Sequence, residues 1–515
     1  MKIIGQIIHK GRKISTSLLL NQAKASKTQL RTLRKLIKKA ENTAFGSHYN
    51  FDQILDSKEI YTTFCSNVPI SDYSKMYPWW QRSYIGEENV TWPGKVDYFA
   101  LSSGTSEGSS KYIPVTPDML KAIRKASLRQ ILSIAKSDFP KDFFAKDYVM
   151  IGGSTDLNFD GKVYSGDLSG ITTQNLPYWF EKFSRPSLEI RSTKNWNEKI
   201  DKITQDAKNW DVVMIAGVPA WIQLLFENII KVYNLKTIHD IWPNLSIYIH
   251  GGVAIDPYKK AINSLCSKPI MYFETYLASE GFIAYQSHEK ATGMRLLFKN
   301  DMYYEFVPFN KDNFNENGEI KTGAEALNIS QVVENKEYAI LLSTCAGAWR
   351  YLIGDVIKFT DVENCEIKIT GRTKHYLSLC GEHLSVDNMN KALEKLSEEF
   401  NQNFVEFTVK GIPFENLFAH EWYIGTERIE SLNSLEVANK LDEILKELND
   451  DYATERLHAL KKINVNLVPN ELFVKWLETR GKLGSQNKFP RVLTDDLFSN
   501  WKDFVESQDP INRVS

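Results

Sequence analysis

The residues with the clearest capacity for chemistry form one polar stretch, residues 101–114, with the sequence LSSGTSEGSSKYIP. This stretch follows the apolar run VDYFAL and combines two glycines with a series of hydroxyl side chains and Lys111. Glycine lets the backbone turn with positive φ, so that successive N–H groups can face one concavity, and a lysine adds charge to it. We predict that this stretch binds the phosphates of a nucleotide triphosphate. The alternative is a polar surface turn, because hydroxyl-rich loops are common.

Two other motifs compete for the same residues. A Walker A loop needs the spacing G-x-x-x-x-G-K-[ST], but Gly104 and Gly108 are one residue too close and Lys111 lies three positions beyond Gly108. Residues 104–108 also satisfy the serine-hydrolase pattern G-x-S-x-G around Ser106. That serine must lead directly into an apolar helix, whereas here it leads into SSKYIPVTP, with a strand-like YIPV. The phosphate interpretation is therefore favoured, and the hydrolase is kept as an alternative.

Composition excludes several classes of protein. The 515 residues are 43% hydrophobic and 25% charged, which are globular proportions, and 63 Lys and Arg against 64 Asp and Glu leave a net charge of −1. A chain so close to neutral has no global field that would hold nucleic acid. The five cysteines are scattered and no two histidines share H-x-x-x-H spacing, so neither a disulfide framework nor a zinc site is indicated. With no apolar run of about 20 residues and no secretory signal, we expect a cytoplasmic protein without a transmembrane segment.

The chain is organised as a large α/β region followed by a smaller one. Short apolar runs at 147–153, 211–217, 245–252 and 269–276 are typical of strands buried on both faces, and helical patterns at 117–136 and 219–233 lie between them. From about residue 340 the pattern changes to consecutive strand-like runs. After Gly371 a shorter region combines helical and strand-like runs in an α+β pattern. We predict an N-terminal domain of residues 1–370 and a mobile C-terminal domain of residues 371–515.

The first forty residues are basic and contain no acidic residue. Apolar residues recur there at helical spacing, which predicts one or two amphipathic helices with basic outer faces. A solvated helix packed on the body of the protein is favoured over a helix that lies on a membrane surface, which stays open as the alternative.

Several segments of the chain resemble those of a known family. The stretch SSGTSEGSSKYIPVT is similar to the phosphate-binding signature of the Gretchen Hagen three (auxin-responsive promoter) family of acyl acid amido synthetases, which belongs to the adenylate-forming enzymes. Further segments match in the family's order: FGSHYNFDQI near the start, TYLASEGF at 275–282, WRYLIGDVIKF at 349–359, GRTKHYLSLCGEHLSVDN at 371–388 and GSQNKFPR at 484–491. The GEHLSVDN form resembles the microbial branch of the family.

The resemblance implies a two-step reaction on a fold of adenylate-forming type. A carboxylate attacks the α-phosphorus of ATP, which gives an acyl-adenylate and pyrophosphate. An amine, typically that of an amino acid, then attacks the activated carbonyl and releases AMP. The family fold has a large N-terminal α/β domain and a small C-terminal domain that rotates between the two steps. The expected substrates are thus a small carboxylic acid, an amino acid and ATP with Mg²⁺.

The resemblance also assigns roles to the nucleotide-binding positions. Those expected to hold the β- and γ-phosphates are Ser102, Ser103, Gly104, Thr105 and Lys111. Gly252 and Val253 end a buried strand, where an adenine ring can approach the backbone and where ligands gather in α/β sheets, and a tight turn is the alternative for them. Tyr276 is expected to face the adenine or the adenylate. Asp355 is expected to accept hydrogen bonds from the ribose hydroxyls, and Arg372 to contact ribose or phosphate.

Two residues are expected to act in catalysis. Glu280 matches the family's metal-associated glutamate, and a carboxylate together with phosphate oxygens is what Mg²⁺ normally binds. An acid at a helix N-terminus is the alternative for this residue. Lys488 matches the C-terminal lysine that offsets negative charge in the adenylation transition state. Arg350, close to Asp355 in the sequence, could form a structural ion pair instead of contacting the nucleotide.

The acid-binding and amine-binding positions are less well defined. Ile171, Trp179 and Val218 are predicted to line an apolar site for the carboxylic acid, although each could belong to the core. His420 is a candidate to meet the amine, and no residue is indicated as the general base. Two alternative functions remain: an acyl-CoA ligase of the same superfamily and a non-catalytic nucleotide-binding protein. The identity of the acid and the amine and the oligomeric state are left open.

Overall fold

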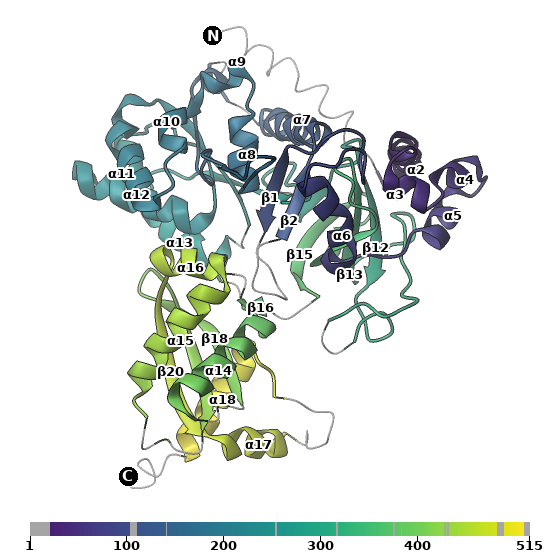
Figure 1. Ribbon diagram of the computed structural model, residues 1–515. Helices are drawn as coiled ribbons and strands as arrows, with labels where there is room; N and C mark the ends of the chain where they lie inside the picture. The colour runs from purple at the N-terminus through teal and green to yellow at the C-terminus, as the bar shows by residue number, and fades with distance from the viewer. Residues whose placement is uncertain are drawn as a thin grey trace. The chain divides into compact units, whose positions relative to one another are not determined.

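The computed structural model describes residues 21–102, 111–137, 139–140, 142–252, 255–315, 318–373, 376–377, 379–382, 384–402, 404, 406–426, 429, 432–480 and 489–508. The contacts divide these residues into two compact units, here called unit 1, up to Thr373, and unit 2, from there onward (Figure 1). The predicted boundary between residues 370 and 371 falls inside a strand of unit 1, β15 (Glu366–Arg372). The assignment of functional domains stays a prediction.

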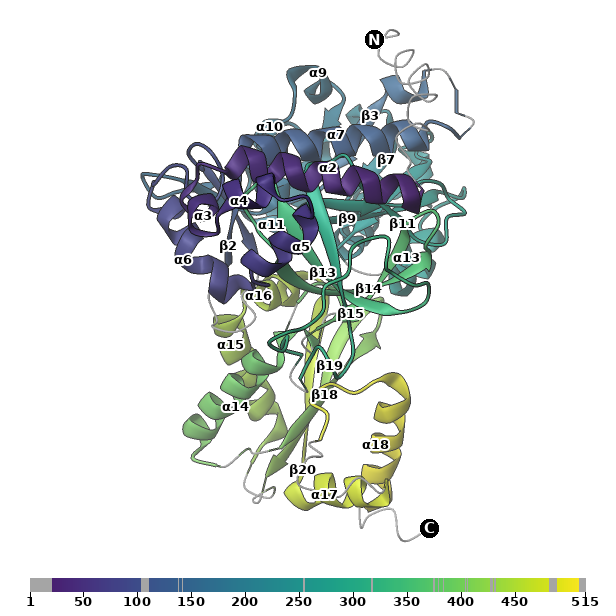
Figure 2. The ribbon, with the colours of Figure 1, turned by 90° about the vertical axis from the view of Figure 1, so that its right-hand side faces the viewer.

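Unit 1 begins with a group of helices. They are α2 (Gln22–Ala40), α3 (Ala44–His48), α4 (Phe51–Asp56), α5 (Ile60–Asn67) and α6 (Tyr73–Tyr84). The amphipathic pattern of α2 buries Leu33, Leu36 and Ile37, and Asn21 caps the helix by accepting from the N–H of Lys24. Figure 2 shows α2 in front of the strands of unit 1, where it packs against β12 (Met302–Pro308). The helix predicted here is confirmed, whereas the apolar residues before position 21 lie outside the described residues.

A small sheet contains the entry to and the exit from the polar stretch. Its order is β2 (Lys111–Val115), β1 (Tyr98–Ser102), β5 (Tyr164–Gly166) and β4 (Asn158–Phe159). Strands β1 and β2 are antiparallel, and Ser102 is paired with Lys111. The stretch therefore continues into a strand, not into the helix that a nucleophilic serine of the hydrolase type requires.

The large sheet has eleven strands within the described residues, in the order β12-β13-β14-β15-β11-β10-β9-β8-β7-β3-β6. The strands besides β12 and β15 are β3 (Asp147–Met150), β6 (Ser184–Arg185), β7 (Val212–Ala216), β8 (Ile247–Gly251), β9 (Met271–Ala278), β10 (Gly281–Tyr285), β11 (Met294–Leu296), β13 (Glu337–Thr344) and β14 (Tyr351–Asp361). Strands β6, β3, β7, β8 and β9 are parallel, and the pairs from β9 through β12 are antiparallel. This mixed α/β architecture confirms the predicted fold class.

Helices cover both faces of the parallel strands. They are α7 (Pro117–Ile134), α8 (Leu168–Gln174), α9 (Tyr178–Glu181), α10 (Leu188–Arg191), α11 (Trp196–Asp206), α12 (Pro219–Tyr233) and α13 (Asp256–Ser264), with 3₁₀ turns at Phe143–Ala145, Ala207–Asn209 and Ile238–Asp240. On one face Gln130 of α7 donates to the Thr275 hydroxyl at 2.7 Å. On the other face the Tyr272 hydroxyl donates to Asn263 of α13 at 2.7 Å. Because side chains alternate along a strand, Tyr276 shares the face of Tyr272.

Unit 2 is built on a three-stranded sheet with the order β18-β19-β20. Its elements are β16 (Tyr376–Leu377), β17 (Leu384–Ser385), α14 (Val386–Phe400), β18 (Phe407–Phe414), β19 (Leu417–Thr426), α15 (Ser434–Leu448), α16 (Asp450–His458), β20 (Leu460–Pro469), α17 (Asn470–Thr479) and α18 (Asp495–Gln508). An aromatic cluster of Phe473, Trp476, Phe489 and Trp501 packs α17 and α18 together. This α+β composition is the one predicted for the second region.

Two general features bear on the class of protein. All five cysteines are free thiols. None of the described helices has the length and apolar character that a membrane crossing would require.

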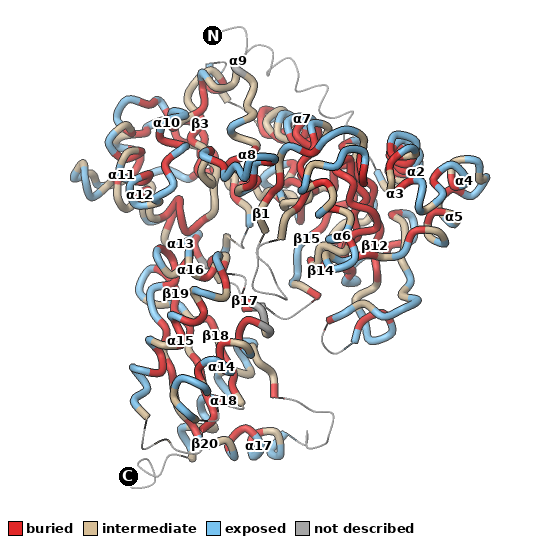
Figure 3. Tube along the Cα trace, viewed as in Figure 1, coloured by how far each residue is buried: buried red, intermediate tan, exposed pale blue. Residues whose placement is uncertain are grey.

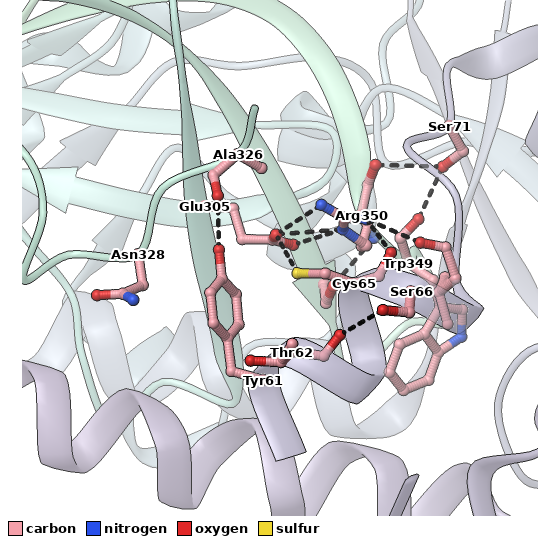
Figure 4. Close-up of polar contacts among 12 residues, drawn as sticks. Tyr61, Thr62, Cys65, Ser66, Ser71, Glu305, Ala326, Asn328, Trp349 and Arg350 are labelled. Atoms are coloured by element: carbon pink, nitrogen blue, oxygen red, sulfur yellow. Dashed lines mark hydrogen bonds and ion pairs between the residues drawn. The ribbon is translucent and has the colours of Figure 1, made fainter. Parts of the chain in front are cut away.

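A buried ion pair fastens the N-terminal helices of unit 1 to the large sheet (Figure 4). The Arg350 guanidinium donates to both carboxylate oxygens of Glu305 at 3.0–3.1 Å, and the two side chains are 6% and 1% exposed. Its Nη1 also donates to the carbonyls of Cys65 and Val68, at the C-terminal end of α5. Arg350 thus has the structural role that the sequence left open, and it satisfies carbonyls that the end of a helix leaves unpaired.

We predict that loss of either member of this pair strongly destabilises unit 1. Arg350→Met or Glu305→Gln alone leaves a buried charge without its partner, which costs about 3–5 kcal/mol, whereas the double replacement costs less than the two single ones together. Urea unfolding followed by tryptophan fluorescence measures these free energies. Asp301→Asn, which breaks the exposed Lys35–Asp301 pair, is the matched control and should cost under about 1 kcal/mol. Additive costs in the double variant would contradict the coupling.

Candidate functional site

The Asp355 carboxylate of β14 joins three strands of unit 1. The Tyr276 hydroxyl of β9 donates to its Oδ2, and Nε of Arg372, at the end of β15, pairs with its Oδ1 at 2.9 Å. Asp355 is 8% exposed and Arg372 is 33% exposed, so the arginine faces outward from a buried carboxylate. Strand pairing sets part of this geometry, because Asp355 and Arg372 are register partners in the β14–β15 ladder.

The contact between Tyr276 and Asp355 requires the sheet to curl. Strands β15, β11 and β10 separate β14 from β9 in the sheet order. In a flat sheet four strand spacings would put the two strands about 19 Å apart, far beyond hydrogen-bond distance. Twist and coiling therefore bring the two strands together on one face. The site is a property of the curled sheet and not of any single segment.

The carboxyl end of β8 lies beside this group. Gly251 pairs with Thr275 of β9, so Gly252 follows at the level of Tyr276. Gly252 has φ +84°, a left-handed conformation that other residues adopt at a cost, and an added Cβ would lie 3.6 Å from Val218. A glycine backbone thus lies at the level of Tyr276 on the neighbouring strand, at the carboxyl edge of the parallel strands, which is where ligands bind in open α/β sheets.

Glu280 lies in the two-residue turn of the β9–β10 hairpin, where Ala278 pairs with Gly281. Burial raises the pKa of Glu280 to about 7, and the nearby Asp355 carboxylate also raises it. The charges of Lys111 and Arg372 lower this pKa and so limit the rise. Glu280, Asp355, Arg372 and Lys111 therefore interact electrostatically and form one charged group.

Lys111 opens β2 at the exit of the polar stretch. Its ammonium group lies 5.6 Å from the centroid of the Tyr73 ring, and Tyr73 also accepts from the Tyr112 N–H at 3.0 Å. Ser102 ends β1 directly opposite. The two residues that flank the predicted phosphate loop are thus described and paired, and the lysine acts electrostatically on Glu280.

The structure brings together some of the predicted site residues and leaves others undescribed. Tyr276, Asp355 and Arg372 are in direct contact, Glu280 and Lys111 are coupled to them by charge, and Gly252 lies on the neighbouring strand. The residues that lie outside the described part of the chain are Ser103, Gly104, Thr105, Val253 and Lys488.

The three residues predicted for the acid differ in their surroundings. Ile171 is fully buried in α8 and packs in the same core cluster as Leu168. Val218 is half-buried and approaches Gly252. Trp179 belongs to α9, but its side chain lies outside the described part. Val218 is thus the one of these residues that the structure brings next to another predicted site residue.

His420 does not lie where the sequence suggested. It is fully buried on β19, and its Nε2 is 2.9 Å from Glu382, also fully buried. Glu382 accepts further from the N–H groups of Leu379, Cys380 and Gly381. Burial alone would raise the pKa of Glu382, but His420 and these N–H groups bring it down to about 2. This histidine is a fully buried partner of a carboxylate, so a part in amine binding stays a prediction.

Sequence reasoning missed Glu382, although the segment that contains it was quoted. Its signal is weak, since one acidic residue in a polar loop is ordinarily solvated. Glu305 was missed too, but its signal is clearer. It is the single charged residue in the apolar strand Met302–Pro308, which indicates a buried partner.

A Mg²⁺ ion would find a limited set of protein ligands here. No group of three or more His, Cys, Asp or Glu residues suited to a metal occurs among the residues that the structure describes. Glu280 offers a carboxylate oxygen from a half-buried side chain with a raised pKa. Mg²⁺ is commonly bound by one or two carboxylates together with phosphate oxygens and water, so this donor set fits an ion that arrives with a nucleotide.

Comparison with known proteins matches successive parts of the chain to one family. Family models match residues 16–158 and 126–270, described as the GH3 family N-terminal domain, residues 295–372, the GH3 family central domain, and residues 387–496, the GH3 family C-terminal domain. The chain is 21% identical to jasmonoyl--L-amino acid synthetase JAR6 of Nicotiana attenuata over 91% of both chains. It is 25% identical to indole-3-acetic acid-amido synthetase GH3.4 of Arabidopsis thaliana over 49% of this chain and 45% of the relative.

Solved structures share the fold. The GH3.15 acyl acid amido synthetase superposes with a TM-score of 0.59 at 15% identity, covering 97% of this chain and 96% of the other. A 2-hydroxyisobutyryl-CoA ligase in complex with its acyl-adenylate and CoA gives 0.58 at 13% identity, covering 94% and 93%. The fold is thus of adenylate-forming type, and it does not by itself separate amide formation from thioester formation.

We predict that ionisation of Glu280 lowers stability as pH rises. Its pKa is about 7 in the folded protein and about 4.5 in the unfolded chain, so the folded state binds more protons between these values. Relative to Glu280→Gln, the free energy of unfolding should be unchanged below pH 4.5, fall between pH 4.5 and 7, and level off above, by about 3 kcal/mol in total. Urea unfolding of both proteins at a series of pH values measures the difference. A constant difference across this range would contradict the prediction.

Proposed function

The chain belongs to the GH3 family, the Gretchen Hagen three family that its motifs resemble, and from this premise we propose that it is an ATP-dependent acyl acid amido synthetase. It would activate a small carboxylic acid as an acyl-adenylate and transfer the acyl group to the amine of an amino acid. The observation that carries the proposal is the buried Asp355 carboxylate, held by Tyr276 and Arg372 beside the bare backbone of Gly252. Such a carboxylate at the carboxyl edge of a parallel sheet suits a ribose and its base.

The first step forms a bond between a carboxylate oxygen and the α-phosphorus of ATP and breaks the bond to pyrophosphate. Ser102, Ser103, Gly104, Thr105 and Lys111 would bind the β- and γ-phosphates. Mg²⁺ on Glu280 and the phosphate oxygens would neutralise charge on the leaving group. Lys488 would stabilise the charge that builds at the α-phosphate. Tyr276 and Arg372 orient Asp355 toward the ribose in this proposal.

The second step forms a bond between the amine nitrogen and the acyl carbon and releases AMP, and the amine loses a proton. Ile171, Trp179 and Val218 would contact the acid, and residues 371–515 would act as the mobile domain that distinguishes the two steps. Free cysteines throughout and the near-neutral charge support a cytoplasmic enzyme whose partners are small molecules and not nucleic acid.

An acyl-CoA ligase is the second candidate, because a 2-hydroxyisobutyryl-CoA ligase has nearly the same fold similarity as the amido synthetase. Carboxylate-dependent exchange of labelled pyrophosphate into ATP tests the step that both functions share. Release of AMP with a panel of amino acids, compared with coenzyme A, then separates them. Absence of exchange across a broad acid library would favour a non-catalytic nucleotide-binding protein.

We predict that Asp355→Ala weakens nucleotide binding by about 10- to 100-fold, because hydrogen bonds to a charged group contribute about 1.5–3 kcal/mol. Fluorescence titration with an ATP analogue measures the affinity. Asp361→Ala, at the far end of the same strand, removes a carboxylate that accepts from Asn364 and is the matched control. Equal affinity in the wild type and Asp355→Ala would remove the ribose role.

We predict that Lys488→Ala lowers pyrophosphate exchange by about 100-fold or more and changes ATP affinity less than about twofold. The reason is that its charge is needed in the transition state and not in the ground state. Lys502→Ala, an exposed lysine of α18, serves as the control. A parallel loss of ATP affinity would make Lys488 a ground-state contact instead.

A further inference from the structure

A buried lysine, Lys199, lies outside the site described above. It belongs to α11, along which buried and exposed residues alternate (Figure 3). Lys199 is only 3% exposed and lies on the buried face of the helix together with Ile200 and Ile203. Lysine is almost never buried without a partner, because the charged form loses its hydration. The position of this ammonium group therefore requires an explanation.

The contacts of the ammonium group supply little compensation. Its Nζ donates to the Gly152 carbonyl at 3.3 Å and lies 5.5 Å from the centroid of the Trp196 ring. Within the part of the chain that the structure describes, these are its contacts, and no carboxylate lies within ion-pair distance of it. Two of its three N–H donors thus have no acceptor among the described residues.

The nearest acidic influence comes from Asp167, which raises the pKa of Lys199 without forming an ion pair. Asp167 is engaged elsewhere, since its Oδ1 accepts from the Ser169 N–H at 2.6 Å and caps α8. Burial is the larger effect and lowers the pKa of Lys199 to about 8, so most of the side chain stays protonated at neutral pH. The Lys199 ammonium group is therefore buried and mostly charged, with one hydrogen bond among the described residues.

The place of Lys199 in the fold relates it to the proposed adenylate site. Gly152 follows the carboxyl end of β3, which pairs with β7, and β7 pairs with β8. Lys199 thus lies at the same edge of the parallel strands as Gly252, two strand spacings or about 10 Å along it. The centroid of the Trp196 ring is 4.0 Å from that of Trp221, in the helix that follows β7, so two aromatic rings in contact with each other lie beside Lys199.

We propose that Lys199 recognises an oxygen acceptor at the far end of the acid substrate, and that the acid is therefore an aromatic or similarly flat acid with a second oxygen group, a hydroxyl or a carboxylate, opposite the carboxylate that is activated. This inference rests on the proposed function, because it takes the activated carboxylate to lie near Gly252. In this proposal the Trp196 and Trp221 rings contact the body of the acid, and the donors of Lys199 that have no acceptor among the described residues bind its terminal oxygen. A substrate that lacks this oxygen leaves the buried donors unpaired, which is strongly unfavourable.

The test compares three matched acids: phenylacetate, 4-hydroxyphenylacetate and 4-carboxyphenylacetate. Pyrophosphate exchange gives kcat/KM for each with the wild type, Lys199→Met and Lys199→Gln. We expect the wild type to prefer at least one oxygen-ended acid by about 10-fold or more and Lys199→Met to lose that preference. The hydroxyl and carboxylate arms distinguish a neutral from an anionic terminal group. Lys199→Gln keeps a donor and should keep part of the preference for the hydroxyl acid, so it also serves if Lys199→Met fails to fold.

Lys208→Met is the matched control, because Lys208 is an exposed cation in the turn that follows α11. It should leave the ratio of the acids unchanged. A wild-type preference for phenylacetate, or the same ratio in wild type and Lys199→Met, would overturn the inference.

If no acid supports exchange, calorimetric titration of the protein with the three acids tests the recognition site independently of the reaction. Binding of the oxygen-ended acids that depends on Lys199 would keep the recognition site while the proposed reaction fails. Binding that is equal in the wild type and Lys199→Met, or absent in both, would overturn the recognition site as well.

Discussion

A single carboxylate holds together the part of unit 1 on which the site depends. Asp355 is nearly buried and bound on one side by Tyr276 of β9 and on the other by Arg372 of β15. A buried charge is tolerated only where donors meet it, so these two contacts must form for the sheet to close in this way. The curl of the sheet and the geometry of the site are therefore one feature. A change that flattened the sheet would separate β9 from β14 and leave the carboxylate without its hydroxyl partner.

The buried carboxylates show that local donors, and not residue type, set the charge at each position. Glu382 receives three backbone N–H groups and His420, and its pKa falls to about 2. Glu455, also in unit 2, has a hydrogen bond from the Cys380 thiol but no such set of N–H donors among the described residues, and burial together with the charge of Glu382 raises its pKa to about 9. The pKa of Glu280, about 7, lies between these two values, because the charges of Lys111 and Arg372 partly offset the effect of burial. Because a carboxylate must be deprotonated to bind a cation, a Mg²⁺ ion at Glu280 would displace the proton that its raised pKa retains.

Much of this arrangement could be predicted from the sequence where the signal is local. The apolar runs predicted the strands β3, β7, β8 and β9, and the motif around Gly354 and Asp355 drew attention to the carboxylate that Tyr276 and Arg372 contact. The two strand-like runs WRYLIGD and VIKFTD form one strand, β14, whose pairing with β13 shifts register around Gly354, where the backbone takes φ +93°. The Tyr276–Asp355 contact could not be predicted from composition or spacing, since it depends on how five strands curl. Lys199 did leave a signal, because its spacing with Ile200 and Ile203 puts it on the apolar face of α11.

Two buried cations of unit 1 show how such a signal can be interpreted. The Arg350 guanidinium is matched by both oxygens of Glu305 and by two helix-terminal carbonyls, so the fold alone accounts for its burial. The Lys199 ammonium has similar burial but one carbonyl and one aromatic ring as contacts. A planar guanidinium that pairs four of its five N–H groups stabilises a core, whereas a lysine with donors to spare gains most when an acceptor enters from outside. The difference in their partners, at equal burial, is what separates a structural cation from one that fits a ligand.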